Sequence, residues 1–240
     1  MGVLREIAGG SKPLLQTKIL MSVALLLRHT GRATFNAMHI TSAIFDLSAP
    51  DLESCPPESL LEFAFIGRSN VGKSSLLNML SGKKDLARVS ITPGHTKTIN
   101  FFTMNNDWYL VDLPGYGFAQ VARENRAKFN DAVTHYLTNR SNLACIFVLI
   151  NSRHEPQGID LEFVHWLGDQ TTRFVLVFTK TDKVTATELQ KNIDLFKEQM
   201  ALWWEDLPAI FTTSAVTRQG RTELLAHVET ILAKGLEDES

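Results

Sequence analysis

The sequence has two cysteines, no long apolar run and no internal repeat, and these shortages exclude several classes of protein. Cys55 and Cys145 are too few for a disulfide framework, and Cys145 lies within the apolar segment 144–150, so we expect a reduced, cytoplasmic setting. No apolar run approaches the roughly 18 residues that a membrane span requires. The nearest, residues 19–27, contains Ser22. The 240 residues, 44% of them hydrophobic, suit one α/β domain with a substantial core.

Acidic residues are scarce in the first 40 positions. This stretch has five basic residues and one acidic residue, Glu6, a formal charge of about +4, and the remaining 19 basic and 25 acidic residues give about −6. Three explanations remain open: a translation start placed too far upstream, with Met38 near the usual start; a targeting segment; or a functional tail that binds a surface.

The segment 67–74, Gly-Arg-Ser-Asn-Val-Gly-Lys-Ser, fits the pattern G-x-x-x-x-G-K-[ST]. It follows a strand-like apolar run, 63–66, and precedes a helix-like stretch, 75–80. Free N–H groups and the positive end of a helix dipole would there form a cradle for phosphate. We expect Lys73 to reach the β- and γ-phosphates and Ser74 to ligate Mg²⁺. The predicted phosphate-binding residues are Gly67, Arg68, Ser69, Asn70, Val71, Gly72, Lys73 and Ser74.

A second motif predicts guanine recognition. The apolar segment 173–178 leads into Thr179, Lys180, Thr181 and Asp182. A carboxylate at the end of such a strand can accept hydrogen bonds from N1–H and the exocyclic amine of guanine, a pair of donors that adenine lacks. The Lys180 stem would pack along the purine. GTPases usually have Asn at the place of Thr179, and Thr can supply one hydroxyl to brace the phosphate loop instead.

A later strand-like segment, 209–213, would complete the base pocket. It delivers Thr213, Ser214 and Ala215, and the backbone N–H groups of the last two could donate to guanine O6.

Two switch-like segments lie between these motifs. Residues 112–115, Asp-Leu-Pro-Gly, form a D-x-x-G: Asp112 would hold Mg²⁺ through a water, and the Gly115 N–H would meet the γ-phosphate. Leu113 and Pro114 complete this predicted contact.

Earlier, the polar loop 91–98 precedes the strand-like segment 99–103. One of its threonines should ligate the metal and sense the γ-phosphate; Thr96 is the first choice and Thr92 the second. Taken alone, the loop could equally be an ordinary turn before a hairpin. The predicted nucleotide contacts here are Gly94, His95, Thr96, Lys97 and Thr98, and the predicted catalytic groups are Lys73, Thr96 and Gly115.

Apolar runs and helix-like stretches alternate along the chain, which predicts an α/β fold: a mostly parallel sheet with helices on both faces and the ligand at the carboxyl ends of the strands. Expected strands are 60–66, 98–104, 108–113, 144–150, 173–178 and 209–213, with 98–104 and 108–113 paired as a hairpin. Expected helices are 125–138, 160–167, 187–204 and 222–234. Residues 48–59, rich in proline and acid, should be a surface segment before the first strand.

These motifs together resemble the EngB family, also called YihA or YsxC, of bacterial and organellar GTPases in the TrmE–Era–EngA–septin group. The likeness rests on Gly-Arg-Ser-Asn-Val-Gly-Lys-Ser-Ser, Thr-Pro-Gly-His-Thr-Lys followed by Asn-Phe-Phe, Asp-Leu-Pro-Gly-Tyr-Gly and Thr-Lys-x-Asp. It implies a single Ras-like P-loop GTPase domain, a monomer that binds GTP and GDP with Mg²⁺. It also implies roles in large-ribosomal-subunit assembly and in normal cell division and septation. We therefore expect a basic extension over 1–42, disordered or an over-extended start, a GTPase domain over 43–236 and an acidic tail over 237–240.

Two residues bear on the rate of hydrolysis. Tyr116 stands where Ras-type enzymes have the Gln that orients the attacking water, so intrinsic hydrolysis should be slow. Asn70 matches a position that helps bind K⁺ in related potassium-activated GTPases, although it could equally brace the loop.

Three classes of function remain to be compared. The leading hypothesis is a GTP-gated assembly factor. A nucleotide or small-molecule kinase would share the phosphate loop, but Asp182 and Ser214-Ala215 argue against it. A membrane- or septum-associated GTPase acting independently of the ribosome is the alternative if the segment 1–39 is genuine.

Ribosomal RNA is the expected partner, although the acidic balance of residues 41–240 argues against bulk electrostatic binding. Local basic residues beside the two switch-like segments are the candidates, with ordinary solvated charge as the rival interpretation. They are Arg123, Arg126 and Lys128, and Lys83, Lys84 and Arg88.

Overall fold

The structure is a computed structural model, and it describes residues 38–87, 98–116, 123–170 and 172–237. The chain divides into two units, Met1–Asn36 and Ala37–Ser240. The first unit lies outside the described residues, and so does the residue range 238–240 at the other end. Within α3 and α6, the side chains at 123–130 and 236–237 are also outside them.

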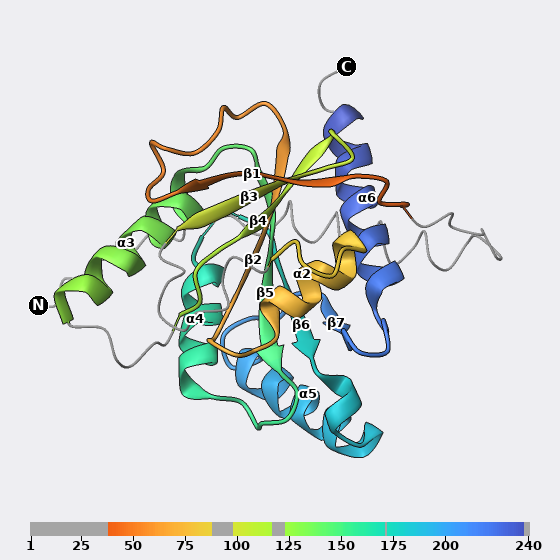
Figure 1. The fold of residues 1–240 in the computed structure, drawn as a ribbon. Coiled ribbons are helices and arrows are strands. Elements are labelled where there is room, and N and C mark those ends of the chain that lie inside the picture. Colours follow the sequence, from red (N-terminus) through yellow and green to blue (C-terminus); the bar gives the residue numbers. More distant parts are fainter. Residues whose placement is uncertain (1–37, 88–97, 117–122, 171, 238–240) are drawn as a thin grey trace, which may run out of the picture. The chain divides into compact units, whose positions relative to one another are not determined.

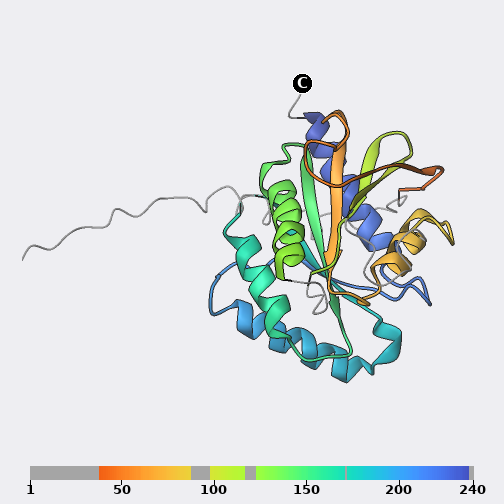
Figure 2. The ribbon, with the colours of Figure 1, turned by 60° about the vertical axis from the view of Figure 1, so that its left-hand side comes forward.

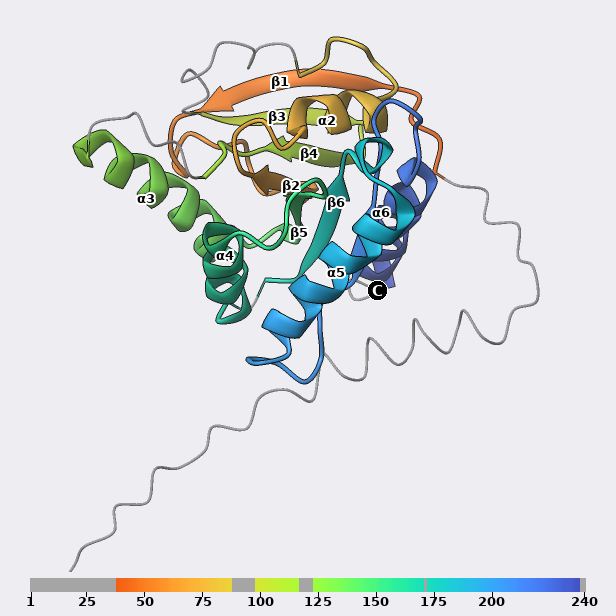
Figure 3. The same cartoon turned by 90° about the horizontal axis from the view of Figure 1, so that it is seen from below.

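A seven-stranded sheet forms the centre of the second unit, in the order β1-β3-β4-β2-β5-β6-β7 (Figures 1 and 3). The strands are β1 (Ala43–Ala49), β2 (Leu61–Gly67), β3 (Ile99–Met104), β4 (Trp108–Asp112), β5 (Leu143–Asn151), β6 (Phe174–Thr179) and β7 (Ile210–Thr212). Five neighbouring strands, from β4 to β7, run parallel, and β3 is antiparallel to both β4 and β1. The central strands β2 and β5 are almost wholly buried, as parallel strands covered on both faces must be. The predicted mostly parallel α/β sheet is confirmed.

Helices cover both faces of this sheet (Figure 2). They are α2 (Lys73–Ser81), α3 (Arg123–Asn139), α4 (Gly158–Gly168), α5 (Ala186–Met200) and α6 (Arg221–Glu237). One core cluster joins the sheet to α3, α4 and α5 through Tyr136, Val164 and Phe196. The other joins it to α2 and α6 through Leu77 and Leu225. The site is therefore built on a sheet that is fixed from both sides.

Helix α5 is shorter than the sequence predicts. The expected helix runs to residue 204, but α5 ends at Met200, and a tight turn follows in which the Trp203 and Trp204 amides both donate to the Met200 carbonyl. The turn brings Trp204 back onto α4, where its ring lies against Gly168. Tertiary packing of one large side chain thus overrides the helical tendency of this segment.

Strand β1 was not expected, and residues 48–49 belong to it rather than to a surface segment. Among the described strands it pairs with β3 alone, with Ala43 opposite Met104 and Ala49 opposite Ile99, and a bulge between Phe45 and Leu47 shifts the register. The bulge and the single-sided pairing break the two-residue alternation by which a strand is recognised.

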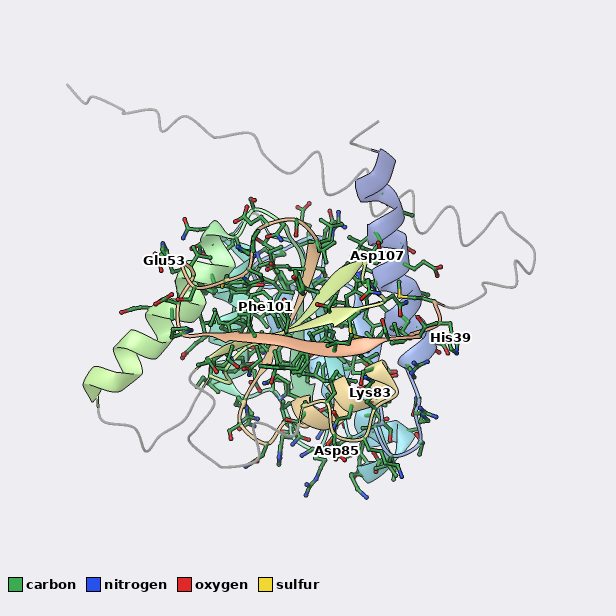
Figure 4. The ribbon with its side chains drawn as sticks, turned by 45° about the horizontal axis from the view of Figure 1, so that its top comes forward. His39, Glu53, Lys83, Asp85, Phe101 and Asp107 are labelled. Carbon is green, nitrogen blue, oxygen red and sulfur yellow. The ribbon has the colours of Figure 1, made fainter. Side chains whose placement is uncertain are left out.

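The start of β1 is held by the turn of the β3–β4 hairpin. Asn105 in that turn accepts hydrogen bonds from the backbone N–H of Thr41 (2.8 Å) and of Ser42 (3.2 Å), and its amide donates to the His39 carbonyl (2.9 Å). His39 and Asp107 mark this end of the hairpin in Figure 4.

A buried ionic cluster fixes the start of β2. The Glu62 carboxylate is fully buried and accepts hydrogen bonds from the Tyr136 hydroxyl (2.6 Å) and from Arg140 Nε (3.0 Å). Arg140 also donates to the Pro56 carbonyl at 2.6 Å. Full hydrogen bonding makes such a buried charge tolerable, and the cluster ties the end of α3 to the amino end of β2.

In the part of the chain that the structure describes, no helix combines the length and apolar character needed to cross a membrane.

Candidate functional site

The motif residues that the structure describes gather at one edge of the sheet. Residues 67–74 follow β2, 112–116 include the end of β4 and its continuation, 179–182 include the end of β6, and 213–215 follow β7. These four strands are parallel members of one sheet, so their carboxyl ends meet along the same edge (Figure 3). This is the edge at which α/β sheets bind their ligands.

The phosphate loop is packed too closely for larger residues at two points. A Cβ on Gly67 would lie 2.8 Å from the Leu149 carbonyl oxygen, and one on Gly115 would lie 2.7 Å from the Gly67 carbonyl oxygen and 3.3 Å from the Ser69 nitrogen. The loop after β2 and the segment after β4 are therefore in direct backbone contact.

Helix α2 begins directly after this loop. Gly72 precedes it with φ 109°, and no described side chain caps the helix start. The first N–H groups of α2 are thus directed toward the loop, where an anion could accept their hydrogen bonds.

Lys73 and Asp112 meet at the centre of the site. The Lys73 ammonium donates to Asp112 Oδ1, and the Asp112 side chain is almost fully buried. Ser74 follows Lys73 in the first turn of α2. Among the described residues, no cluster of three or more His, Cys, Asp or Glu side chains could hold a metal by itself. The hydroxyl of Ser74 and the carboxylate of Asp112 are nevertheless hard oxygen donors of the kind that Mg²⁺ prefers, so the residues present fit that ion together with a phosphate.

Thr179 takes over the bracing of the phosphate loop. Its hydroxyl donates to the Val71 carbonyl (2.7 Å) and lies 3.2 Å from the Ile150 carbonyl. The Thr179 carbonyl in turn accepts the hydroxyl of Ser152 (2.7 Å), whose own carbonyl accepts the amide of Asn192 from α5 (2.9 Å). The sequence predicts the hydroxyl of Thr179 but gives no signal for Ser152 or Asn192, which no motif connects to the loop.

Lys180 lies across the same loop. It adopts φ 60°, and its ammonium donates to the Asn70 carbonyl at 2.6 Å. Its stem passes the position of Gly72, where an added Cβ would lie 3.4 Å from Lys180 Cε. Partial burial, followed by the nearby charge of Arg153, lowers the pKa of Lys180.

The Asp182 side chain is oriented by Ser214, which follows the neighbouring strand β7. Its Oδ1 accepts the hydroxyl of Ser214 at 2.7 Å, and the exposed Lys183 ammonium lies 3.2 Å from Oδ2. The hydrogen bond from Ser214 is the main reason that the pKa of Asp182 is lowered. The carboxylate is thus kept ionised and oriented, as an acceptor for two base N–H groups must be.

The loop after β7 is closed by a residue that the sequence does not indicate. The Gln219 carbonyl accepts the backbone N–H of the fully buried Ser214 (3.2 Å), and its side-chain oxygen accepts the Thr181 hydroxyl (3.1 Å). The Thr181 N–H also donates to the Thr213 carbonyl at 3.2 Å. Thr213, Ser214 and Ala215 are therefore fixed beside Asp182. The prediction that the Ser214 N–H donates to guanine O6 is wrong, because that N–H is buried and donates to the Gln219 carbonyl.

Tyr116, directly after the D-x-x-G, is buried against α4. Its hydroxyl donates to Asp160 Oδ1 at 2.9 Å, and its ring stacks on Phe163 with centroids 4.5 Å apart. Arg68 Nε lies 3.1 Å from the same Asp160 oxygen. Burial raises the pKa of Asp160, and burial followed by the Asp160 charge raises that of Tyr116 well above its usual value. No sequence motif points to Asp160.

Several predicted residues have a different placement or none. The range 88–97, with Arg88, Thr92, Gly94, His95, Thr96 and Lys97, lies outside the described residues. Thr98 is described, and its hydroxyl donates to Asn100 Oδ1 at 3.3 Å. The side chain of Leu113 is part of the core beneath the site, and its N–H donates to the Phe65 carbonyl (3.0 Å), after which Pro114 leads to Gly115.

The candidate RNA-binding residues are only partly described. Arg123, Arg126 and Lys128 belong to α3, but their side chains lie outside the described residues. The Lys83 ammonium, labelled in Figure 4, donates to the Ala43 carbonyl at the start of β1. Lys84, also exposed, does not make this contact.

Comparison with known proteins identifies similar sequences. A family model described as "50S ribosome-binding GTPase" matches residues 62–180. A probable GTP-binding protein EngB from Christiangramia forsetii is 48% identical over 194 residues, which is 81% of this chain and 98% of the relative. Its counterpart from Bacteroides fragilis is also 48% identical, over 81% of this chain and 96% of the relative.

Solved structures agree on the fold. A crystal structure of a probable GTP-binding protein engB superposes with a TM-score of 0.59 at 24% identity, over 72% of this chain and 99% of that one. At this identity the superposition supports the fold alone, a mostly parallel α/β sheet shared with GTP-binding proteins. The sequence relatives match almost from end to end, and the chain therefore belongs to the EngB family of GTP-binding proteins and is a GTP-hydrolysing enzyme.

Proposed function

We propose that this GTPase is a nucleotide-gated assembly factor for the large ribosomal subunit and that it is needed for normal cell division and septation. The observation that carries the proposal is the match to a family model described by 50S ribosome binding, over residues 62–180, a range that holds the phosphate loop and the D-x-x-G. A structure of Era with a fragment of 16S ribosomal RNA has a TM-score of 0.53 at 23% identity, and it supports the fold alone.

In the proposed cycle, the phosphates of GTP lie in the loop 67–74. Lys73 leaves Asp112 to neutralise the β- and γ-phosphates, and the N–H groups at the start of α2 donate to their oxygens. Ser74 and Asp112, with Thr96, would hold Mg²⁺, which supplies positive charge between the phosphates. The Gly115 N–H would meet the γ-phosphate, because Gly115 already lies against the loop.

The guanine would lie between Lys180 and the loop after β7. Asp182, oriented by the Ser214 hydroxyl, would accept from N1–H and the exocyclic amine, and the backbone N–H of Ala215 would face O6, because that of Ser214 already donates to the Gln219 carbonyl. A base without those two donors would leave the ionised carboxylate of Asp182 unpaired, and this penalty is the source of selectivity.

Hydrolysis in the isolated protein is proposed to be slow. The Tyr116 hydroxyl is committed to Asp160 and its ring to Phe163, so Tyr116 does not reach an attacking water as the Gln of Ras-type enzymes does. A partner or a K⁺ ion would then supply the missing assistance. Asn70, exposed at the tip of the loop with φ 63°, is the residue that would hold K⁺.

The docking surface is proposed to be local, because the chain carries a net charge of only −2. Lys84 and the basic residues of α3, Arg123, Arg126 and Lys128, flank the switch-like segments, so the γ-phosphate could control their contact with ribosomal RNA.

We further propose a monomer in the cytoplasm, where its two free cysteines, Cys55 and Cys145, would stay reduced.

Sedimentation with purified large subunits tests the function. We expect co-sedimentation with a non-hydrolysable GTP analogue and its loss with GDP, and we expect Lys73→Ala to abolish the difference. Reversal of Arg123, Arg126 and Lys128 to Glu should abolish binding and leave nucleotide affinity intact, whereas reversal of Lys191 and Lys197 on α5 should not. Identical sedimentation in both nucleotides would contradict the proposal, and equal losses from both sets of reversals would show unspecific charge attraction.

A further inference from the structure

Two clusters of the same chemistry lie at opposite ends of β2. At its amino end, the buried Glu62 carboxylate accepts hydrogen bonds from Tyr136 of α3 and from Arg140, which follows α3. At its carboxyl end, the buried Asp160 accepts from Tyr116 and Arg68. The first cluster ties a helix to the sheet, far from the phosphate loop. The second joins three segments of the site itself.

Burial disfavours the charge of Asp160, and its place in α4 and its two partners partly offset that cost. It is the third residue of the helix, at the end where the helix dipole favours an anion, and its side chain is only 2% exposed. One oxygen, Oδ1, receives both the Tyr116 hydroxyl at 2.9 Å and Arg68 Nε at 3.1 Å. The carboxylate therefore links α4 to the phosphate loop and to the residue after the D-x-x-G.

The two residues that contact Asp160 lie next in sequence to Gly67 and Gly115, whose backbones are in contact. Arg68 follows Gly67, Tyr116 follows Gly115, and Arg68 and Tyr116 also form a parallel backbone bridge. Between them, Gly115 is so close to the loop that an added Cβ would lie 2.7 Å from the Gly67 carbonyl oxygen. A carboxylate that holds both flanking residues fixes this approach.

We propose that Asp160 is a positioning residue for γ-phosphate recognition, which holds Gly115 against the phosphate loop through Tyr116 and Arg68 and thereby favours GTP over GDP. The inference rests on the proposed contact between the Gly115 N–H and the γ-phosphate. GDP does not reach Gly115, so loss of the Asp160 contacts affects the triphosphate selectively. Helix α4 is in this way part of the nucleotide switch.

Nucleotide titrations of Tyr116→Phe and Asp160→Asn test the inference. We expect affinity for a non-hydrolysable GTP analogue to fall about fivefold to tenfold, the size of effect that one lost hydrogen bond produces, and affinity for GDP to change less than about twofold. The matched control is Tyr136→Phe, which removes the same kind of hydroxyl from Glu62 and should leave both affinities unchanged. The double variant Tyr116→Phe/Asp160→Asn should lose no more than the more severe single variant, because both act through one link.

The outcomes separate a positioning role from a structural one. Equal losses for the analogue and GDP, or no loss for either, would overturn the role of Asp160. Gly115→Ala tests the underlying contact: if it spares analogue affinity, the proposed γ-phosphate contact itself is wrong. If Gly115→Ala weakens the analogue but not GDP, and Asp160→Asn weakens neither, the contact stands and only the inference about Asp160 fails.

Discussion

At position 179 the chain carries a hydroxyl where GTPases usually carry an amide, and one hydrogen bond replaces the usual brace. The Thr179 hydroxyl reaches the Val71 carbonyl in a fully buried setting. Thr179→Val keeps the shape and removes this donor, so we expect the free energy of unfolding to fall by about 1 to 2 kcal/mol and GDP affinity to fall with it. Urea unfolding and GDP titration would measure the two effects. Thr179→Asn, which supplies an amide instead, should keep GDP affinity. If Thr179→Val changes neither stability nor GDP affinity, the loop does not need this hydrogen bond.

The proposed base selectivity depends on Asp182. Asp182→Asn places a donor opposite the guanine N1–H, so we expect GTP affinity to fall by about 10- to 100-fold and affinity for XTP to rise. Competition between GTP and XTP for a fluorescent nucleotide would measure the change. Lys183→Ala is the control, because it removes only the exposed ion pair to Asp182. Near-normal GTP affinity without a gain for XTP would refute the assignment.

Residues within contiguous motifs could be predicted from the sequence, and residues that support them could not. The segment 67–74 carries its own pattern of glycines, lysine and serine, so its place was predictable. Asp160, Ser152, Asn192 and Gln219 reach the site from elements far along the chain. Nothing in their local sequence differs from an ordinary polar residue, and only the fold shows which atoms they meet.

At the scale of elements, strands buried on both faces were easy to recognise and the edge strand was not. Strand β5 and, apart from Glu62, strand β2 are apolar runs between polar turns. In β1, by contrast, Ile44 and Phe45 are both substantially exposed beside a bulge, so no regular pattern remains to be read. The end of α5 could not be predicted either, because it depends on the packing of Trp204 against Gly168 of α4.

The contact between α4 and the turn after α5 can be tested at one glycine. A Cβ on Gly168 would overlap the ring of Trp204, whereas one on Gly158, at the other end of α4, would meet no described atom within 4 Å. We expect Gly168→Ala to lower the free energy of unfolding by about 1 to 3 kcal/mol and to shift tryptophan fluorescence. Gly158→Ala, the matched control, should change stability by less than about 0.5 kcal/mol. Similar stabilities for both variants would mean that Trp204 can move away freely.

At the scale of the whole molecule, stability should depend on pH through His227. This residue of α6 lies between Phe147 and Phe211, and burial, followed by the charges of Arg173 and Lys234, lowers its pKa to about 4. Because the folded-state pKa lies below the ordinary 6.5, the unfolded chain takes up the proton first. Stability is therefore lost as pH falls from about 6.5 to about 4, by up to about 3 kcal/mol.

Comparison with His227→Leu isolates this contribution. The Nε2 atom of His227 is buried and has no hydrogen-bond partner among the described residues, so an apolar side chain is acceptable there. Guanidinium unfolding between pH 4 and pH 8 should show a difference between the two proteins that is constant above pH 7 and shifts in favour of the variant at lower pH. A difference that does not vary with pH would exclude His227 as the cause.

The order of the strands has a consequence for the chain as it is synthesised. The phosphate loop follows β2 near the beginning, but β2 needs β4 and β5 as neighbours, and the base-side residues follow β6 and β7. Between Ser74 and Ser214, synthesis takes on the order of 10 s, during which a nascent chain has the phosphate loop without the proposed pocket for guanine. Guanine nucleotides can thus stabilise this protein only after nearly the whole sheet has emerged. Their binding therefore stabilises the completed fold and does not direct the early steps of folding.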